Sequence, residues 1–410
     1  MSPEVGIVLL QFRVKNYRSI GDEITIDLTA GKGREHADFL INNNGVKVLP
    51  VISMYGNNAS GKSNIIQAFH AMFINMFTSY TYGNSGKFHA TPFLFDDALS
   101  KEPTECEIFF CLGMYEYQYG YKATNDRVYE EWLYYRKQSS RDTVVKTVFE
   151  RAKGKIEFFG VYKKFSWYQG FVDKNGLVLS LLGNRKAEKP TKSEKIFIDI
   201  AGWARNNFFC SVIHDFDENK LNEFYCEMDE LKKLTLEILQ EFDPSIKDID
   251  VKKKTNTDGE SVYEVFTKHR EEWYPLNIES VGTQKLFTVS AGIMLALRYQ
   301  STTLVYDELD NCLHPLILRR IVAMFHDKEV NIMNSQLIFT SHNLTLLNRN
   351  ELRRDEIWFV EKNENEFTTA YSLDSFKSTA DEVRADLDYG KHYLSGRFGA
   401  VPYLNKKGKG

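Results

Sequence analysis

Residues 56–63, GNNASGKS, interrupt two apolar runs and constrain the fold of this chain more than any other stretch. The run VLPVISMY precedes them, and NIIQAFHAMF follows at once with apolar residues at helical spacing. Gly56 and Gly61 let the backbone wrap closely around an anion, so that consecutive N–H groups point inward at the positive end of the next helix. The pattern predicts a strand, a phosphate-binding loop and a helix that begins near Lys62.

This loop has the spacing of a nucleotide-binding motif. Lys62 would supply a mobile cation for the β- and γ-phosphates, and the Ser63 hydroxyl would bind Mg²⁺. A glycine turn without a ligand is disfavoured because a strand and a helix flank the motif. We therefore predict these nucleotide-binding residues: Gly56, Asn57, Asn58, Ala59, Ser60, Gly61, Lys62 and Ser63.

Two later apolar strands end in side chains suited to hydrolysis. TTLVYDEL (302–309) ends in Asp307 and Glu308, of which one carboxylate can hold Mg²⁺ and the next can orient a water as general base. SQLIFTSHN (335–343) delivers His342 at its carboxyl end, the edge at which open α/β sheets bind ligands. Taken alone, an acidic turn and a structural histidine would explain these residues equally well.

A second anion site is predicted upstream of residues 302–309. NIESVGTQKLFTV (277–289) places a serine hydroxyl and a glycine N–H at the start of a predicted helix. An ordinary helix N-cap is the alternative interpretation. The residues concerned are Ser280, Gly282, Thr283 and Gln284.

The apolar patterns predict three regions. Residues 1–150 would hold a strand pair within 9–29, one unbroken strand at 47–55, the loop and its helix, and a β-meander at 105–135. Residues 151–270 would form an inserted, mostly helical lobe whose helix at 222–244 stops at Pro244. Residues 271–410 would return to alternating helices and strands, with a helix at 283–300 and another between the strands at 335–342 and 355–362.

Composition limits the class of protein. The chain has 410 residues, a net charge of −4 and a pI near 6.2, which argues against a surface that is positively charged throughout. Its five cysteines include no C-x-x-C pair, as expected of reduced thiols in the cytoplasm. No apolar window approaches the length of a membrane span, so we expect no membrane partner.

Together these motifs resemble the head of an ABC-type ATPase of the SMC/RecF kind. FRVKNYRSI resembles the opening strand, GNNASGKS the Walker A loop, and ESVGTQ a degenerate signature motif. LVYDEL with Asp310 resembles the Walker B motif and D-loop, and IFTSH the switch-histidine loop. More narrowly, DELDNCLHP, FTSHN and YLSGRFGAVP (393–402) resemble compact ATPases of bacterial anti-phage operons, which include abortive-infection ATPases, the PARIS and Septu ATPase subunits and, as cousins, the OLD nucleases.

The resemblance implies an α/β fold, with a mixed sheet, flanking helices, an antiparallel meander and an inserted lobe. It implies slow, Mg²⁺-dependent hydrolysis of ATP. Asp307 would be a metal ligand beside Ser63, Glu308 the base and His342 the sensor of the γ-phosphate. Asp310 and the signature residues 280–284 would act across a homodimer or higher homo-oligomer.

One expected part of such heads is missing from the sequence. We find no convincing Q-loop glutamine, because Gln118 lies within a predicted strand. Its role is left unassigned within HATPFLFDD (89–97).

For function, the resemblance implies a sensor or regulatory subunit of anti-phage defence, triggered by a phage protein and controlling a separate nuclease or toxin. The D-x-D of Asp386 and Asp388 lies in a polar stretch without a buried strand, so we expect effector chemistry on another polypeptide. The alternatives are a RecF/SMC-like DNA-binding ATPase in repair and an ATP-locked scaffold with negligible turnover.

DNA is a further candidate partner, and its contact would need clustered cations. Three segments are basic, but none alternates its cations with several aromatic residues, so we predict solvated faces there. They are RVKNYR (13–18), NRKAEKPTKSEK (184–195) and Lys252–Lys254.

Overall fold

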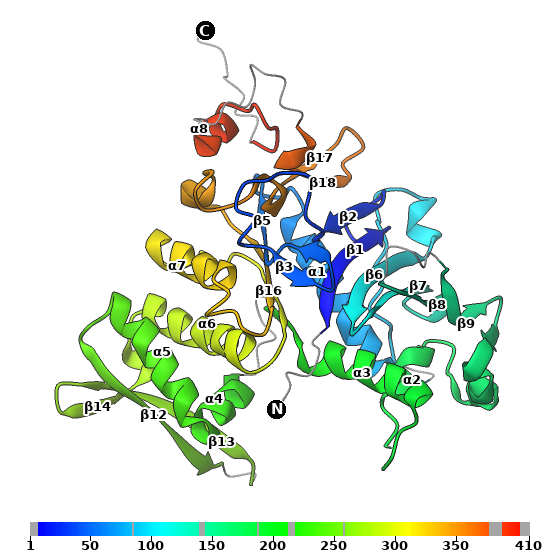
Figure 1. Ribbon diagram of the computed structural model, residues 1–410, viewed down its shortest axis with the longest axis horizontal. Coiled ribbons are helices and arrows are strands. Elements are labelled where there is room, and N and C mark those ends of the chain that lie inside the picture. Colours follow the sequence, from blue (N-terminus) through cyan, green and yellow to red (C-terminus); the bar gives the residue numbers. More distant parts are fainter. Residues whose placement is uncertain are drawn as a thin grey trace.

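The computed structural model describes residues 7–83, 86–138, 144–186, 188–211, 218–256, 259–376 and 388–401. Two large β-sheets and the helices between and beside them build the molecule (Figure 1). The first sheet has seven antiparallel strands and the second has six strands, most of them parallel. This is the mixed α/β architecture predicted from the sequence.

The seven-stranded sheet confirms the predicted strand pair and meander. Every neighbouring pair in it is antiparallel, and the strand β1 (Val8–Lys15) lies between β2 and β6. On one side of β1 lies β2 (Ile24–Asp27), which is an edge strand. The other side continues in spatial order with β6 (Thr104–Leu112), β7 (Tyr115–Thr124), β8 (Arg127–Lys137), β9 (Lys146–Ala152) and β10 (Lys155–Phe158).

The six-stranded sheet carries the predicted phosphate-loop strand at its centre. Its spatial order is β11 (Phe208–Ser211), β15 (Thr303–Tyr306), β16 (Gln336–Thr340), β5 (Val51–Tyr55), β17 (Ile357–Lys362) and β18 (Thr368–Ser372). Only the β17–β18 pair is antiparallel. The carboxyl ends of β5, β15 and β16 therefore meet at one edge of the sheet.

The predicted unbroken strand at 47–55 is wrong. The chain leaves one strand at Val48 and enters β5 at Val51, because Pro50 has no N–H to give to a ladder. Residues before the break form a small separate pair, β3 (Ile41–Asn43) with β4 (Val46–Val48).

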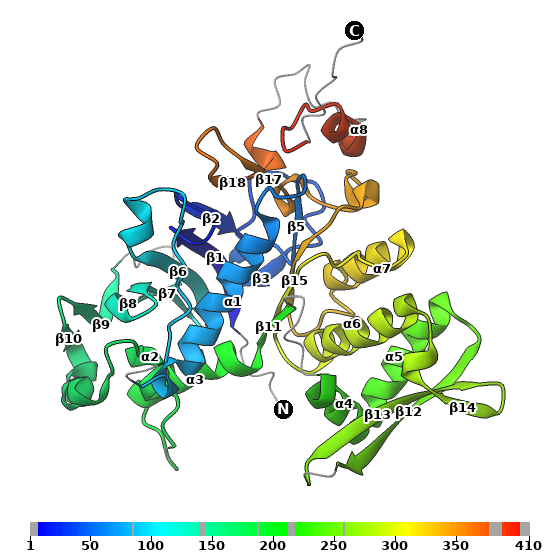
Figure 2. The same cartoon turned by 180° about the vertical axis from the view of Figure 1, so that it is seen from behind.

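Both faces of the parallel strands are buried, against different cores. Ile52 and Met54 of β5 face a core that includes helix α1 (Lys62–Thr78), where Phe69 stacks on Phe12 of β1 at 3.9 Å between ring centroids. Val51 and Tyr55 face the other core, with α6 (Val281–Arg298) and α7 (Pro315–His326). Figure 2 shows α1 and the pair α6 and α7 on opposite sides of β5 and β15. This double burial explains the continuous apolar runs.

The structure divides residues 151–270 differently from the predicted inserted lobe. Residues up to Ala204 pack into the core that contains α1, through α2 (Val178–Gly183) and α3 (Lys192–Asn206). The strand β11 joins the six-stranded sheet. Only the later part forms a separate lobe, beside α6 (Figure 1). That lobe contains α4 (Glu218–Glu227), α5 (Asp229–Phe242), β12 (Ile246–Thr255), β13 (Ser261–His269) and β14 (Glu272–Pro275), so it is not mostly helical. The longest helix in the range is α3, with 15 residues.

Two predicted helices are also corrected. The helix at 222–244 is two helices, because Met228 takes an extended conformation and caps α5. The helix expected between 342 and 355 is replaced by the 3-10 turns η5 (Leu344–Leu346) and η6 (Arg354–Glu356). The remaining short elements are η1 (Ser79–Thr81), η2 (Leu99–Lys101), η3 (Gly160–Phe171), η4 (Leu276–Ile278), η7 (Leu373–Ser375) and α8 (Tyr389–Leu394).

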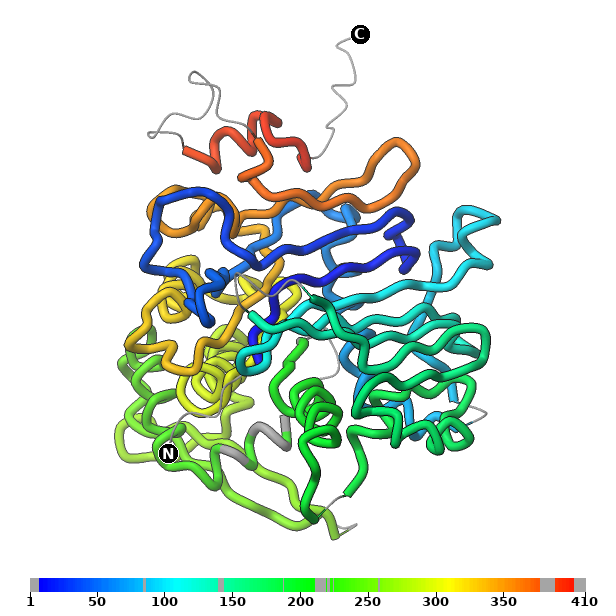
Figure 3. Tube along the Cα trace, turned by 45° about the vertical axis from the view of Figure 1, so that its right-hand side comes forward, coloured from blue at the N-terminus to red at the C-terminus, as the bar shows by residue number. Residues whose placement is uncertain are grey.

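The hairpin β17–β18 lies beside β1 and β2, although more than 300 residues separate them in sequence (Figure 3). The Thr368 N–H donates to the Ser19 carbonyl at 2.8 Å. Asp386 of the D-x-D motif lies outside the described residues, and Asp388 caps α8. Of the helices that the structure describes, none is long and apolar enough to cross a membrane.

Gln336 of β16 is a buried side chain that links the two sheets. Its carboxamide oxygen accepts from the Leu9 N–H at 2.8 Å, and its nitrogen donates to the carbonyls of Leu9 at 2.9 Å and Leu49 at 3.3 Å. Gln336→Ala should therefore lower the free energy of unfolding by about 2–3 kcal/mol, because it leaves buried backbone groups unpaired. Urea unfolding measures this, with the exposed Gln169→Ala as control. Equal midpoints for both variants would contradict the bridging role.

Candidate functional site

The phosphate loop is held against β17 and β18 at its two glycines. A Cβ on Gly56 would lie 2.2 Å from the Val360 carbonyl oxygen, and one on Gly61 would lie 1.9 Å from Thr368 Oγ1. Gly61 also has φ of +105°, which disfavours any side chain. Both glycines are thus required by the packing of the loop, in addition to the approach of a ligand.

Hydroxyl groups fix the outer turn of this loop. Thr368 Oγ1 donates to the Ser60 carbonyl at 3.0 Å and lies 2.7 Å from Ser19 Oγ, which in turn accepts from Asn64 Nδ2 at 2.6 Å. The network joins the loop and the first turn of α1 to the turn after β1. The loop is therefore pre-shaped by three separate segments of the chain.

Lys62 lies buried at the bottom of the loop. Its Nζ donates to the carbonyls of Gly56 at 2.8 Å and Asn57 at 3.1 Å. Burial lowers the pKa of this ammonium, while the negative charges of Asp307, Glu308 and Asp310 raise it. The lysine therefore lies within electrostatic reach of the carboxylates after β15.

Thr340 at the end of β16 holds the Asp307 carboxylate and the backbone of Glu308. Its hydroxyl donates to Asp307 Oδ1 at 2.6 Å and accepts from the Glu308 N–H at 2.7 Å. Glu308 has a positive φ of 48°, which turns the chain sharply away from the strand. Next to it, Asp310 Oδ2 accepts from the His342 N–H at 3.1 Å, so the turns that follow β15 and β16 are joined.

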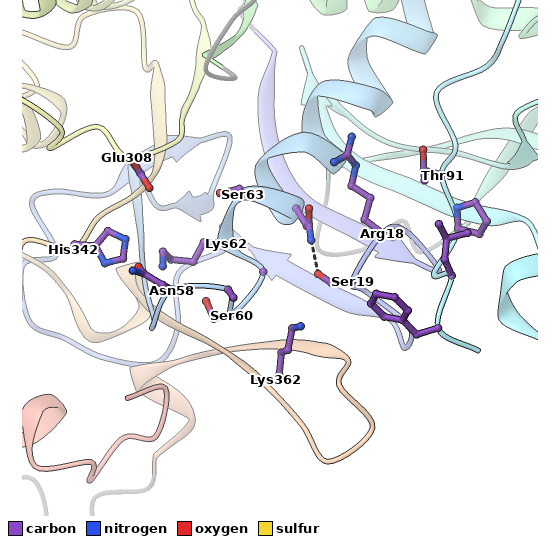
Figure 4. A pocket seen from close by; sticks show the side chains of 16 residues that line it. Arg18, Ser19, Asn58, Ser60, Lys62, Ser63, Thr91, Glu308, His342 and Lys362 are labelled. Atoms are coloured by element: carbon purple, nitrogen blue, oxygen red, sulfur yellow. Dashed lines mark hydrogen bonds between the residues drawn. The ribbon is translucent and has the colours of Figure 1, made fainter. Parts of the chain in front are cut away.

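A cleft of about 810 Å³ opens beside the phosphate loop, and Figure 4 shows its lining. Lys62 and Ser63 lie at its centre, Glu308 and His342 at one end, and Arg18 and Thr91 at the other. The structure thus brings together residues from the ends of β5, β15 and β16. Asp307 is buried behind the lining, held by Thr340.

Sequence reasoning missed the far wall of the cleft. Arg18 and Ser19 follow β1, Lys362 ends β17, and Thr91, Pro92, Leu94 and Phe95 come from the segment left unassigned. That segment lies in the cleft, whereas Gln118 bonds Glu107 Oε1 at 2.6 Å within the antiparallel sheet. Arg18, in NYRSI, was the one residue whose type could have indicated this wall, because a guanidinium group binds phosphate well.

The predicted signature residues do not line this cleft. Ser280 caps α6 by accepting from the Thr283 N–H at 3.1 Å, and Gln284 Nε2 donates to the carbonyl of Glu279 at 2.8 Å. Gly282 packs on the segment after β15, where a Cβ would lie 2.9 Å from the Cys312 carbonyl oxygen. Within one chain, Ser280 is therefore an ordinary helix N-cap. That these residues contact a nucleotide bound by a second subunit stays a prediction.

Thr340→Val should release the Asp307 carboxylate and the Glu308 N–H without changing side-chain volume much. We expect turnover of ATP to fall about tenfold, as is typical when a group that orients a metal ligand is lost. Nucleotide binding measured without Mg²⁺ should not change. Thr340→Ser keeps the hydroxyl and serves as the matched control. A valine variant that turns over at the wild-type rate would exclude this role.

The chain was compared with known proteins. A family model described as "AAA domain, putative AbiEii toxin, Type IV TA system" matches residues 51–348. No curated protein matches. Solved structures that match include the SMC head domain from Thermotoga maritima, at 15% identity and a TM-score of 0.41, over 89% of this chain and 98% of that chain.

Another match is the Smc head domain with a coiled coil and joint derived from Pyrococcus yayanosii. It has 11% identity and a TM-score of 0.49, over 96% of this chain and all of that chain. The family match covers the phosphate loop, the carboxylates after β15 and His342, the residues that the fold brings to one edge. The chain belongs to the AAA-domain family described as putative AbiEii toxin of type IV TA systems.

Proposed function

We propose that this chain is a Mg²⁺-dependent ATPase that acts as the sensor or regulatory subunit of an anti-phage system and controls a separate effector. One observation carries the ATPase part. Lys62, Glu308 and His342, from three strand ends, line the same cleft, with Asp307 fixed behind them by Thr340. A phosphate-binding loop that served only as a scaffold would not need the carboxylate pair.

The residues fit ATP and Mg²⁺. The loop from Gly56 to Ser63 presents backbone N–H groups at the start of α1, and the cations of Lys62, Arg18 and Lys362 surround the cleft. Ser63 and Asp307 would hold Mg²⁺, which supplies neutralisation of phosphate charge when bound. Glu308 would orient and deprotonate the attacking water, and His342 would contact the γ-phosphate.

The site is proposed to be completed by a second subunit. Ser280, at the exposed N-terminus of α6, is flanked by two apolar side chains that lie open to solvent, Ile278 at 63% and Val281 at 67%. A serine cap and helix N-terminus would add donors to phosphate held by a partner. Asp310 would contact that partner beside His342. The expected unit is a homodimer or a higher homo-oligomer.

The defence role rests on the family description, which names a putative AbiEii toxin and a type IV TA system. The proposed chain senses a phage protein and passes its nucleotide state to a nuclease or toxin on another polypeptide. We place this work in the cytoplasm, where phage replicate. The repair and scaffold alternatives make different predictions for turnover and for phage infection.

Composite sites predict a specific complementation. Lys62→Ala should abolish ATP binding, and Ser280→Arg should keep binding but block closure on a partner's phosphate. Each variant alone should be inactive. Mixed in equal amounts, they should recover about a quarter of wild-type turnover, since half of the dimers carry one intact site. Phosphate release measures this.

Glu308→Gln is the control for that experiment, because it should bind ATP, hydrolyse slowly and accumulate closed dimers. An unchanged lack of activity in the mixture, together with full turnover by a monomeric form, would exclude the composite site.

The defence role is tested by phage challenge of cells that express the chain with its neighbouring genes. Protection should be lost with Lys62→Ala and with removal of the neighbouring effector gene. Protection by the chain alone would show that it carries its own effector activity. ATP turnover without any effect on infection would instead favour the repair alternative.

A further inference from the structure

The 3-10 helix η3 exposes two of its five aromatic residues to solvent. Tyr162, Phe165 and Tyr168 recur at every third residue, the repeat of a 3-10 helix, and are buried. Phe165 meets Phe197 of α3 edge to face at 5.3 Å between centroids, which anchors the element. Two further rings of the element are exposed, Trp167 at 62% and Phe171, its last residue, at 63%. A rigid element thus presents two large rings to solvent.

The basic segment 184–195 lies against this helix. Lys164 Nζ donates to Thr191 Oγ1 at 3.0 Å, and the Arg185 guanidinium lies 4.6 Å from the centre of the Tyr168 ring. In Figure 2 the neighbouring elements β10, α2 and α3 occupy the same corner of the molecule. We call this surface the aromatic–basic face; it comprises Val161, Lys163, Lys164, Trp167, Phe171, Arg185, Lys186, Lys189 and Lys192.

The aromatic–basic face differs in charge from the rest of the chain. Residues 153–195 contain ten lysines and arginines and four carboxylates, whereas the whole chain has a net charge of −4. One of those carboxylates, Glu194, already has partners within the segment. It accepts a hydrogen bond from the Thr191 N–H at 2.9 Å and lies 3.5 Å from the Arg185 guanidinium. The exposed lysines around the rings therefore form a local positive field in an acidic protein.

Two neighbouring rings contact the indole of Trp167, which is still 62% exposed. Trp167 rests on Tyr168 at 3.8 Å between centroids and meets Phe171 edge to face at 5.6 Å. The buried tyrosine supports the indole, and the exposed part of the indole is left for a flat partner. Stacked rings beside cations are the elements with which proteins hold unpaired bases and their phosphates.

We propose that the aromatic–basic face binds single-stranded nucleic acid, with Trp167 and Phe171 stacking on bases and the surrounding lysines contacting phosphates. A duplex keeps its bases stacked inside and would use only the cations. A membrane surface would need a continuous apolar stripe, but the inward half of η3 is already buried in the core. None of the residues of the face lines the nucleotide cleft, so the proposal is independent of ATP binding.

The test measures the anisotropy of a labelled oligothymidylate, about 20 nucleotides long, titrated with the full chain at several salt concentrations. We expect binding that weakens steeply with salt. Trp167→Ala should weaken it about tenfold, within the range for loss of one base stack. Lys163→Glu with Lys164→Glu should weaken it further and flatten the salt dependence.

The matched controls lie on the other lobe. Trp273→Ala removes an indole that is 38% exposed on β14, and Lys252→Glu with Lys254→Glu reverses two exposed lysines on β12. Both should bind like the wild type. A labelled duplex and vesicles rich in anionic lipid are titrated alongside. Three results would each overturn the proposal. The chain fails to bind the oligonucleotide, or the control variants lose as much affinity as the variants of the face. The third is tighter binding to duplex or vesicles, with no effect of Trp167→Ala.

Discussion

The six-stranded sheet is buried on both faces, and the position of the candidate site follows from this constraint. Along β5, alternate side chains enter the core around α1 and the core around α6 and α7, so the strand has no solvated face for polar chemistry. Polar groups are free of the cores only where the strands end. Because β5, β15 and β16 run parallel, these ends meet, and Lys62, Glu308 and His342 lie along the same cleft.

The residues that could be predicted from the sequence are those defined by local patterns. The phosphate loop, the carboxylates after β15 and His342 each follow an apolar strand directly, and the structure places the loop, Glu308 and His342 at the cleft, with Asp307 buried behind it. Errors occurred where one residue overrides a pattern that spans many. Pro50 divides an apolar run into two strands, and Met228 divides an amphipathic run into two helices. The segment 151–270 was misjudged because membership of a core depends on tertiary contacts.

Other parts of the site have no local pattern. Arg18, Thr91 and Lys362 enter the cleft from three segments whose proximity depends on the hairpin β17–β18 lying beside β1. Likewise, the segment 184–195 contains no aromatic residue, and sequence analysis predicted a solvated face there. The aromatic neighbours come from η3, more than ten residues earlier, and only the fold places them together.

The hydrogen bonds of Lys62 have a consequence for the selectivity of the loop. An ammonium group has three N–H bonds, and two of them point to the carbonyl oxygens of Gly56 and Asn57. One N–H is left for a ligand, so the lysine braces the loop and offers a single directed contact at the same time. The two backbone hydrogen bonds therefore limit the number of ligand atoms to which Lys62 can donate. An arginine at the same position has a planar guanidinium, which could not keep both backbone hydrogen bonds and still donate to the ligand in the same place. The geometry of the loop therefore selects lysine, in addition to its charge.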